Sequence, residues 1–134
     1  MKLPLPLFLL LTILTACKKD QSQLVDYRAI GNKFSITWTD ADGSEHTEIA
    51  RGEWNKRILF QVGDRLSLAA CTIAYDTTYQ TNSQGVVVDT VITSVYNAGV
   101  TLWAFKANER RSSIASGGCD TGGQCGSFSA TVPE

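Results

Sequence analysis

Few residues in this chain could do chemistry: four cysteines, one histidine and a short acidic stretch. His46 lies in a polar segment, and no motif such as GxSxG supplies the nucleophile that a general base needs. The carboxylates of Asp40–Glu45 suit a hard cation, but the glycine stands at the fourth position instead of the sixth that an EF-hand requires. We therefore interpret His46 as a structural residue and Asp40–Gly43 as a hairpin turn. No catalytic residue, metal ligand or cofactor is assigned.

The first cysteine stands directly behind an apolar run. Lys2 precedes the twelve residues from Leu3 to Leu14, and small residues lead up to Cys17. A basic residue, an apolar stretch and small residues in this order are typical of a secretory signal. A membrane span is the alternative, but it needs about 20 apolar residues to cross ~30 Å of hydrocarbon, and Pro4 and Pro6 interrupt this shorter run.

The residues Leu14-Thr15-Ala16-Cys17 resemble the lipobox of bacterial lipoproteins. The resemblance implies cleavage between Ala16 and Cys17, diacylation of the Cys17 thiol and acylation of the new amino terminus. The membrane is then a partner through lipid, since each buried methylene contributes about 0.8 kcal/mol and two chains hold firmly. We expect residues 1–16 to be a lipoprotein signal peptide, residues 17–23 a lipidated cysteine with a polar tether, and residues 24–134 one domain.

Composition bounds the partners of this domain. Removal of residues 1–16 leaves 118 of the 134 residues, with 11 basic and 13 acidic side chains. This length fits one domain. No basic cluster exceeds Lys18-Lys19, so nucleic acid is not expected as a partner. Lys18-Lys19-Asp20 is similar to the export signals of surface lipoproteins of Bacteroidota-type bacteria, which implies a lipid-anchored protein of the cell envelope, at the outer membrane and surface-exposed.

Three cysteines remain once Cys17 is the anchor. Disulfides persist in the envelope, so one bridge and one leftover thiol is the simplest count. Cys119 and Cys125 close a short glycine-rich loop, and cysteines that are near in sequence meet most easily. We therefore predict a disulfide between Cys119 and Cys125, while the state of Cys71 stays open.

From Leu24 onward, apolar and polar residues alternate with period two, and turn residues separate the alternating segments. The pattern predicts a first hairpin that turns at Gly31-Asn32, then a weaker strand from Glu45 to Ala50 and a loop that holds Trp54. Trp54 and Trp38 are expected in the core. Further strands are predicted at Ile58–Val62, Leu66–Ala70, Val100–Lys106, Arg110–Ser116 and Gly126–Val132.

No helical pattern of ten or more residues follows Cys17. Eight or nine short strands without helices favour an all-β fold, and we expect an antiparallel two-sheet immunoglobulin-like sandwich with one long β-hairpin. The cysteine loop is expected to join the last two strands.

The long hairpin is predicted between Cys71 and Tyr96. A four-residue turn at Asn82–Gly85 would place Tyr79 opposite Val88 and Tyr75 opposite Ile92, and would give the ribbon one apolar face. So large an apolar face either covers the core or meets a partner, and the sequence leaves both open. The candidate binding residues on this face are Tyr75, Tyr79, Ile92 and Tyr96.

Trp103 and Phe105 are a second pair of candidate binding residues. If Leu102 faces the core, both rings face outward, and exposed large aromatics often mark binding surfaces. Burial under the long hairpin is the alternative, and both are kept.

A second resemblance rests on residues spread over the domain. Val25-Asp26-Tyr27, Phe34–Trp38, Asp42-Gly43, Trp54 and Gly63–Leu68 are in order similar to small envelope lipoproteins with one immunoglobulin-like sandwich, and to the small membrane-protein accessory family of mycobacteria, which assists lipid export. These families turn tightly where this chain has its long hairpin, and the cysteine loop is not part of their pattern.

The resemblance implies a non-catalytic protein that binds or positions a partner in the envelope, either another protein, a lipid or a glycan. An adhesive or structural surface subunit is the alternative. A hydrolase is the third class, and the missing histidine and carboxylate constellations count against it.

Overall fold

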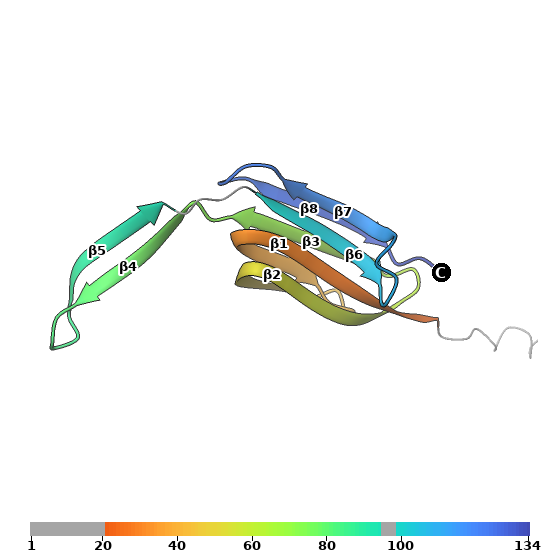
Figure 1. The fold of residues 1–134 in the computed structure, drawn as a ribbon. Helices are drawn as coiled ribbons and strands as arrows, with labels where there is room; N and C mark the ends of the chain where they lie inside the picture. Colours follow the sequence, from red (N-terminus) through yellow and green to blue (C-terminus); the bar gives the residue numbers. More distant parts are fainter. Residues whose placement is uncertain (1–20, 95–98) are drawn as a thin grey trace, which may run out of the picture.

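The computed structural model describes residues 21–94 and 99–134, and this part of the chain contains strands and no helix (Figure 1). The strands form a six-stranded and a two-stranded antiparallel sheet. An all-β antiparallel fold is thereby confirmed for the described residues. The strands are β1 (Ser22–Thr39), β2 (Glu45–Gln61), β3 (Arg65–Thr72), β4 (Tyr75–Thr81), β5 (Val87–Ser94), β6 (Val100–Lys106), β7 (Ser113–Cys119) and β8 (Cys125–Thr131).

The long strands β1 and β2 pair along their whole length, from Ser22 opposite Gln61 to Thr39 opposite Glu45. The turn predicted at Gly31-Asn32 is wrong, because β1 continues through a register shift between Gly31 and Lys33. Such a bulge bends a strand and increases its twist without ending it. The loop predicted around Trp54 is likewise part of β2. Two bent strands therefore stand where the sequence pattern indicated four short ones.

The bend allows β1 to belong to two layers. One edge of β1 pairs with β2 throughout, while the other edge pairs with β6 over Val25–Gly31 and with β3 over Phe34–Trp38. Beyond these neighbours, β7 continues the β6 layer and β8 continues the β3 layer. The two layers share the bent β1–β2 pair on one side and end at β7 and β8 on the other.

Glycines allow β7 and β8 to approach each other. A methyl group on Gly126 would lie 2.3 Å from the carbonyl carbon of Gly118, and one on Gly117 would lie 2.8 Å from the carbonyl oxygen of Ser127. Side-chain carbons do not come this close to backbone atoms. The seam between β7 and β8 therefore requires glycine and makes the six-stranded sheet nearly a barrel.

The core lies between the two layers. Trp38 and Trp54, both predicted to be core residues, are 6% and 8% exposed, and their ring centroids are 5.1 Å apart. Burial of such aromatic rings dominates a small core, since each removes on the order of 150–250 Å² from water. The largest fully buried side chains belong to Tyr27, Phe34, Phe60, Ile36, Leu66, Leu68, Leu102, Val25 and Val132.

The disulfide joins Cys71 to Cys125, so the predicted bridge between Cys119 and Cys125 is wrong, and Cys119 is the free thiol within the described residues. Cys71 and Cys125 lie directly opposite each other in the β3–β8 ladder, with 4.0 Å between their Cα atoms. Loop length was a poor guide because sheet register, not sequence distance, sets which Cα atoms face each other. The cysteine loop does join the last two strands, although β7 begins at Ser113, later than predicted.

Several predictions fall outside the described residues: the signal peptide at 1–16, the lipidation of Cys17, the tether as far as residue 20, and Tyr96 of the hairpin. In residues 21–94 and 99–134, no helix is long and apolar enough to cross a membrane.

Candidate binding surface

The six-stranded sheet forms the body of the domain. The β4–β5 hairpin projects from one end of this body and is exposed along both strands (Figure 1). The sequence left open whether the apolar face of this hairpin covers the core, and the structure excludes that interpretation. Tyr75, Tyr79 and Ile92 are 64%, 63% and 67% exposed. These side chains therefore do not belong to the core. The other exposed large apolar residues of the hairpin and its turn are Val86, Val87, Val88 and Val91.

The register sorts the hairpin residues onto two faces, because directly opposed residues of a ladder share a face. Thr77 lies opposite Ile92 and Tyr79 opposite Thr90. The predicted register was therefore wrong by two residues, but a shift of two preserves the face. The uncharged face consists of Tyr75, Thr77, Tyr79, Thr81, Val87, Thr90, Ile92 and Ser94, and the acidic face consists of Asp76, Thr78, Gln80, Asp89, Val91 and Thr93.

Asp76 fixes the base of the hairpin to the body. Its carboxylate accepts a hydrogen bond from Lys33 Nζ of β1 and another, 2.8 Å long, from Arg51 Nη2 of β2. The hydrogen bond from Lys33, followed by that from Arg51, lowers the pKa of Asp76 from 3.8 to about 2. Just before β4, the Ile73 amide donates to the Lys33 carbonyl over 3.0 Å.

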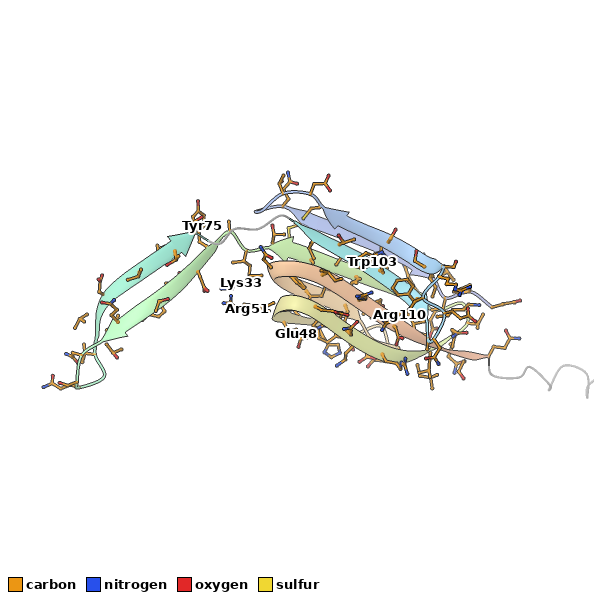
Figure 2. The ribbon with its side chains drawn as sticks, viewed as in Figure 1. Lys33, Glu48, Arg51, Tyr75, Trp103 and Arg110 are labelled. Atoms are coloured by element: carbon orange, nitrogen blue, oxygen red, sulfur yellow. A yellow bond between two sulfur atoms is a disulfide. The ribbon has the colours of Figure 1, made fainter. Side chains whose placement is uncertain are left out.

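These contacts decide which face of the hairpin points outward. Asp76 belongs to the acidic face, so that face turns toward the body at the hairpin base, where Lys33 and Arg51 lie (Figure 2). Tyr75 precedes Asp76 and therefore points to the opposite side. The uncharged face is turned away from the body, and the hairpin does not cover Trp103 and Phe105.

Trp103 and Phe105 have environments that neither sequence interpretation described. Phe105 is only 7% exposed, so the alternative in which its ring is exposed is wrong, and Trp103 is half-buried. Their rings stack with centroids 6.5 Å apart, and the Arg28 guanidinium lies 5.7 Å from the Trp103 centroid. Because Arg28 also pairs with Glu53 at 3.0 Å, this aromatic pair already has partners within the chain.

Charged pairs cover the same sheet face around these rings. Arg57 binds the buried carboxylate of Asp26 through two hydrogen bonds of 2.6 and 2.9 Å. The hydrogen bonds from Arg57 hold the pKa of Asp26 below its usual value, although burial opposes this shift. A hydrogen bond from Asn55 and the charge of Arg28 likewise lower the pKa of Glu53. Ion pairs that are satisfied within the chain indicate a structural role for this face.

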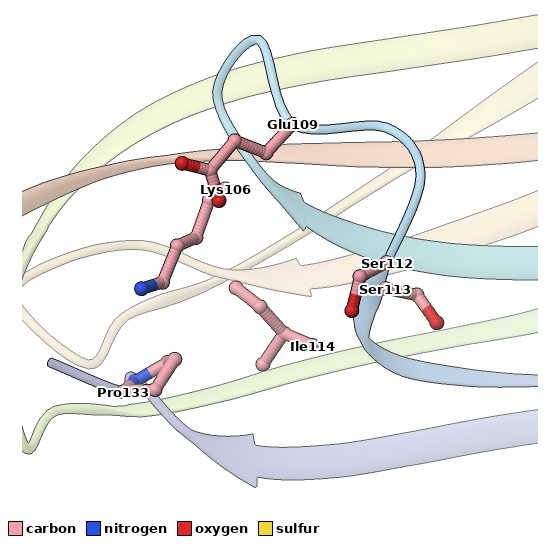
Figure 3. Close-up of a pocket in the computed structure, with 6 residues that line it drawn as sticks. All are labelled: Lys106, Glu109, Ser112, Ser113, Ile114 and Pro133. Atoms are coloured by element: carbon pink, nitrogen blue, oxygen red, sulfur yellow. The ribbon is translucent and has the colours of Figure 1, made fainter.

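A cavity of about 210 Å³ lies between the β6–β7 loop and the end of the chain (Figure 3). Lys106 Nζ donates to the Glu134 carbonyl over 2.6 Å, so the one ammonium group in the lining is already engaged. The lining has neither histidine nor cysteine, and it offers no nucleophile paired with a base. The lining residues are Lys106, Glu109, Ser112, Ser113, Ile114 and Pro133.

The acidic stretch forms the predicted hairpin turn between β1 and β2. The Gly43 amide donates to the Asp40 carbonyl over 3.0 Å, and Ser44 donates from its amide and its hydroxyl to Asp42. These bonds from Ser44 lower the pKa of Asp42. His46 stacks on Trp38 at 5.4 Å between centroids. Among the described residues, no group of three or more histidine, cysteine or acidic residues is placed to hold a metal ion.

No family model, curated protein or solved structure matches this chain. The choice among its surfaces therefore rests on geometry and burial. Seven of the eleven exposed large apolar residues in the described part of the chain belong to the hairpin and its turn, while the surface around Trp103 is already paired. The hairpin therefore becomes the candidate binding surface.

Sequence reasoning identified three residues of this surface, Tyr75, Tyr79 and Ile92, from their shared face. It missed the contacts of Asp76 with Lys33 and Arg51. These residues are 43 and 25 positions apart from Asp76 along the chain. No local pattern signals such pairs, because they depend on the bend that brings the middle of β1 and of β2 to the same end of the body.

Proposed function

We propose that this chain is a non-catalytic, lipid-anchored protein of the cell envelope, with an immunoglobulin-like sandwich as its body and the β4–β5 hairpin as its partner-binding element. The single observation that carries the proposal is the exposure of Tyr75, Tyr79 and Ile92 on a hairpin that turns this face away from the body. The partner we propose is another protein.

The energetics of a two-stranded ribbon support a protein partner. A two-stranded hairpin alone is marginally stable in water, and a third strand or a packed face is needed for independent stability. Large aromatic and β-branched side chains gain free energy when they leave water, at about 25 cal/mol per Å² of apolar surface. A partner that covers the hairpin would supply both stabilising terms.

The position of the hairpin also suits an anchored protein. β1 begins at the end of the body opposite to the hairpin (Figure 1). The first half of β1, from Ser22 to Gly31, spans about 30 Å at about 3.3 Å per residue. An anchor at Cys17, five residues before β1, would hold that end at the membrane and direct the hairpin away from it.

An adhesive or structural subunit is a second candidate, and it would use the same hairpin toward another cell or a filament. The projection of the hairpin away from the start of β1 favours it equally. The two functions differ in whether the partner lies in the same membrane or outside it.

The test removes the apolar groups of the uncharged face. In the intact lipoprotein, Tyr75→Ser, Tyr79→Ser and Ile92→Ser are combined, and crosslinking in whole cells is followed on denaturing gels. We expect the wild-type chain to give a discrete crosslinked product that the triple variant loses, while the unfolding transition of the triple variant stays within about 1 kcal/mol of wild type because the side chains are already exposed.

A matched control replaces exposed apolar residues elsewhere. Ile49→Ser and Leu59→Ser on β2 remove side chains that are 66% and 56% exposed. The crosslinked product should persist in this double variant. If the triple variant keeps the product as well, or if wild type gives none, the hairpin is not the binding element.

A further inference from the structure

We propose that the occupant of the uncharged face is the same face of a second copy of this chain. The proposal rests on the proposed function, since it names the partner of the hairpin. It places two hairpins face to face about a twofold axis, so that Tyr75, Tyr79 and Ile92 of each copy are covered by the other.

The distribution of charge on the hairpin is the first argument for a second copy. The uncharged face has no acidic or basic residue, whereas Asp76 and Asp89 both lie on the acidic face. Packing of two uncharged faces therefore brings no like charges together and leaves both acidic faces in water. A partner chosen by charge would need a charged group here, since opposite charges are what select such partners. The same face of a second copy packs against this one without placing any charged group in the contact.

The orientation of the hairpin is the second argument, because it leaves the uncharged face accessible. The ion pairs of Asp76 with Lys33 and Arg51 hold the acidic face toward the body of the same chain. The uncharged face is open on the far side, so a second hairpin reaches it without meeting the body. In a twofold arrangement each body lies on the outside of the paired hairpins, and the contact closes after two copies.

The available area sets the strength of the contact. Two tyrosines that are each almost two-thirds exposed offer on the order of 100–150 Å² apiece. With Ile92, Val87 and the threonines, two copies would bury on the order of 1,000 Å², which is the lower limit for a specific interface. The contact is therefore weak in dilute solution and gains from confinement to one membrane, which raises the effective concentration of each copy for the other.

The contrast with β2 shows why the hairpin, and not another exposed strand, would pair. β2 carries Glu45, Glu48, Arg51, Glu53, Lys56 and Arg57 along its length, and a face that contains several charged groups is costly to cover. β5 carries one charged residue, Asp89, among β-branched neighbours. Of these two strands, only β5 can be covered by a second copy without the burial of several charged groups.

The test uses four threonine-to-cysteine variants of the full lipoprotein in native membranes, with Cys119→Ser as background so that the added thiol is the free one of the described residues. Thr77→Cys and Thr90→Cys place the thiol on the uncharged face, and Thr78→Cys and Thr93→Cys place it on the acidic face. All four threonines are exposed. A short bismaleimide reagent then links thiols that lie within its reach.

We expect Thr77→Cys and Thr90→Cys to give a band of twice the chain mass, at least five-fold stronger than the band from Thr78→Cys and Thr93→Cys. Addition of the Tyr75→Ser, Tyr79→Ser and Ile92→Ser changes should remove the band, and dilution in detergent should weaken it. Equal bands from both faces, or a band from the acidic face alone, would overturn the face-to-face arrangement.

Two further outcomes separate this proposal from the proposed function. If the thiols of the uncharged face link only to a protein of another mass, the second copy is wrong, while partner binding by the hairpin stands. If neither face links to any protein, both proposals fall.

Discussion

Arg51 Nη2 lies 2.8 Å from Asp76 Oδ2. This ion pair joins the middle of β2 to the base of the projecting hairpin. Lys33 of β1 binds the other oxygen of the same carboxylate. One acidic side chain thus receives two cations from the two bent strands. This arrangement determines which face of the hairpin is free to meet a partner.

Asp76→Asn should loosen the hairpin and leave the body intact. The amide keeps the shape of the side chain but loses its charge, so both ion pairs are lost. We expect faster amide hydrogen exchange in β4 and β5, unchanged exchange in β1 and β6, and only a small change in the free energy of unfolding, because Asp76 is solvent-accessible. Asp89→Asn, on the same face but away from Lys33 and Arg51, is the control and should not change exchange near the hairpin base.

Protonation of the Asp76 carboxylate should release the hairpin from its fixed orientation at low pH. Hydrogen bonds from Lys33 and Arg51 lower the pKa of Asp76 in the folded chain to about 2, against the ordinary aspartate value of 3.8. A depressed pKa gives stabilisation that is present above the unfolded value and is lost as the pH falls through about 2. The hairpin should therefore keep its orientation at pH 4 and lose it near pH 2. A carboxyl NMR titration of Asp76 with a midpoint near 4 would contradict the ion pairs.

Peptide mapping without reduction should recover Cys71 linked to Cys125. The bridge spans 54 residues, and the chain-entropy model gives a stabilisation of about 4 kcal/mol for a loop of that size. Cys71→Ser should therefore lower the free energy of unfolding by up to about 4 kcal/mol. Cys119→Ser, which removes the free thiol, should change it by less than about 1 kcal/mol. Recovery of Cys119 in the bridge would show that the β3–β8 register is wrong.

Gly126→Ala tests the seam between β7 and β8. The new methyl group would lie 2.3 Å from the Gly118 carbonyl carbon, so the two strands must separate. We expect a loss of about 1–3 kcal/mol, as for other overpacked sites, measured by chemical denaturation. Ser127→Ala, the next residue of β8 with an exposed side chain, should be nearly neutral. Equal effects of the two substitutions would mean that the seam is open.

Cys17→Ala tests the proposed anchor. If the Cys17 sulfur carries the lipid, the variant should incorporate no labelled fatty acid and should remain unprocessed by the lipoprotein-specific peptidase. Cys119→Ser provides the control, since it also removes a thiol. Unchanged labelling of the Cys17→Ala chain would rule out the lipoprotein proposal and leave the hairpin as a binding element of a protein held by other means.

The sequence indicated some features because they depend on local alternation. Period two over Val25–Ala29 and Phe34–Trp38 placed the right residues in the core, and the same parity grouped Tyr75, Tyr79 and Ile92 on one face even though the predicted register was two residues off. The predicted strand boundaries were less accurate than the predicted faces. A turn was predicted at Gly31-Asn32 and a loop around Trp54, yet the chain passes through both places without leaving the sheet.

By itself the sequence determined the strand class of the domain, the alternation of its faces and the composition of the hairpin, since each follows from the order of neighbouring side chains along an extended backbone. Only the tertiary structure decided that Cys71 faces Cys125, that Phe105 is buried, and that Asp76 meets Lys33 and Arg51. The physical reason is the bend of β1 and β2. It brings Lys33 and Arg51 to the hairpin base, where they meet a residue far from them in sequence. A second reason is the register of β3 and β8, which places Cys71 opposite Cys125 through backbone hydrogen bonds that any residue type can make.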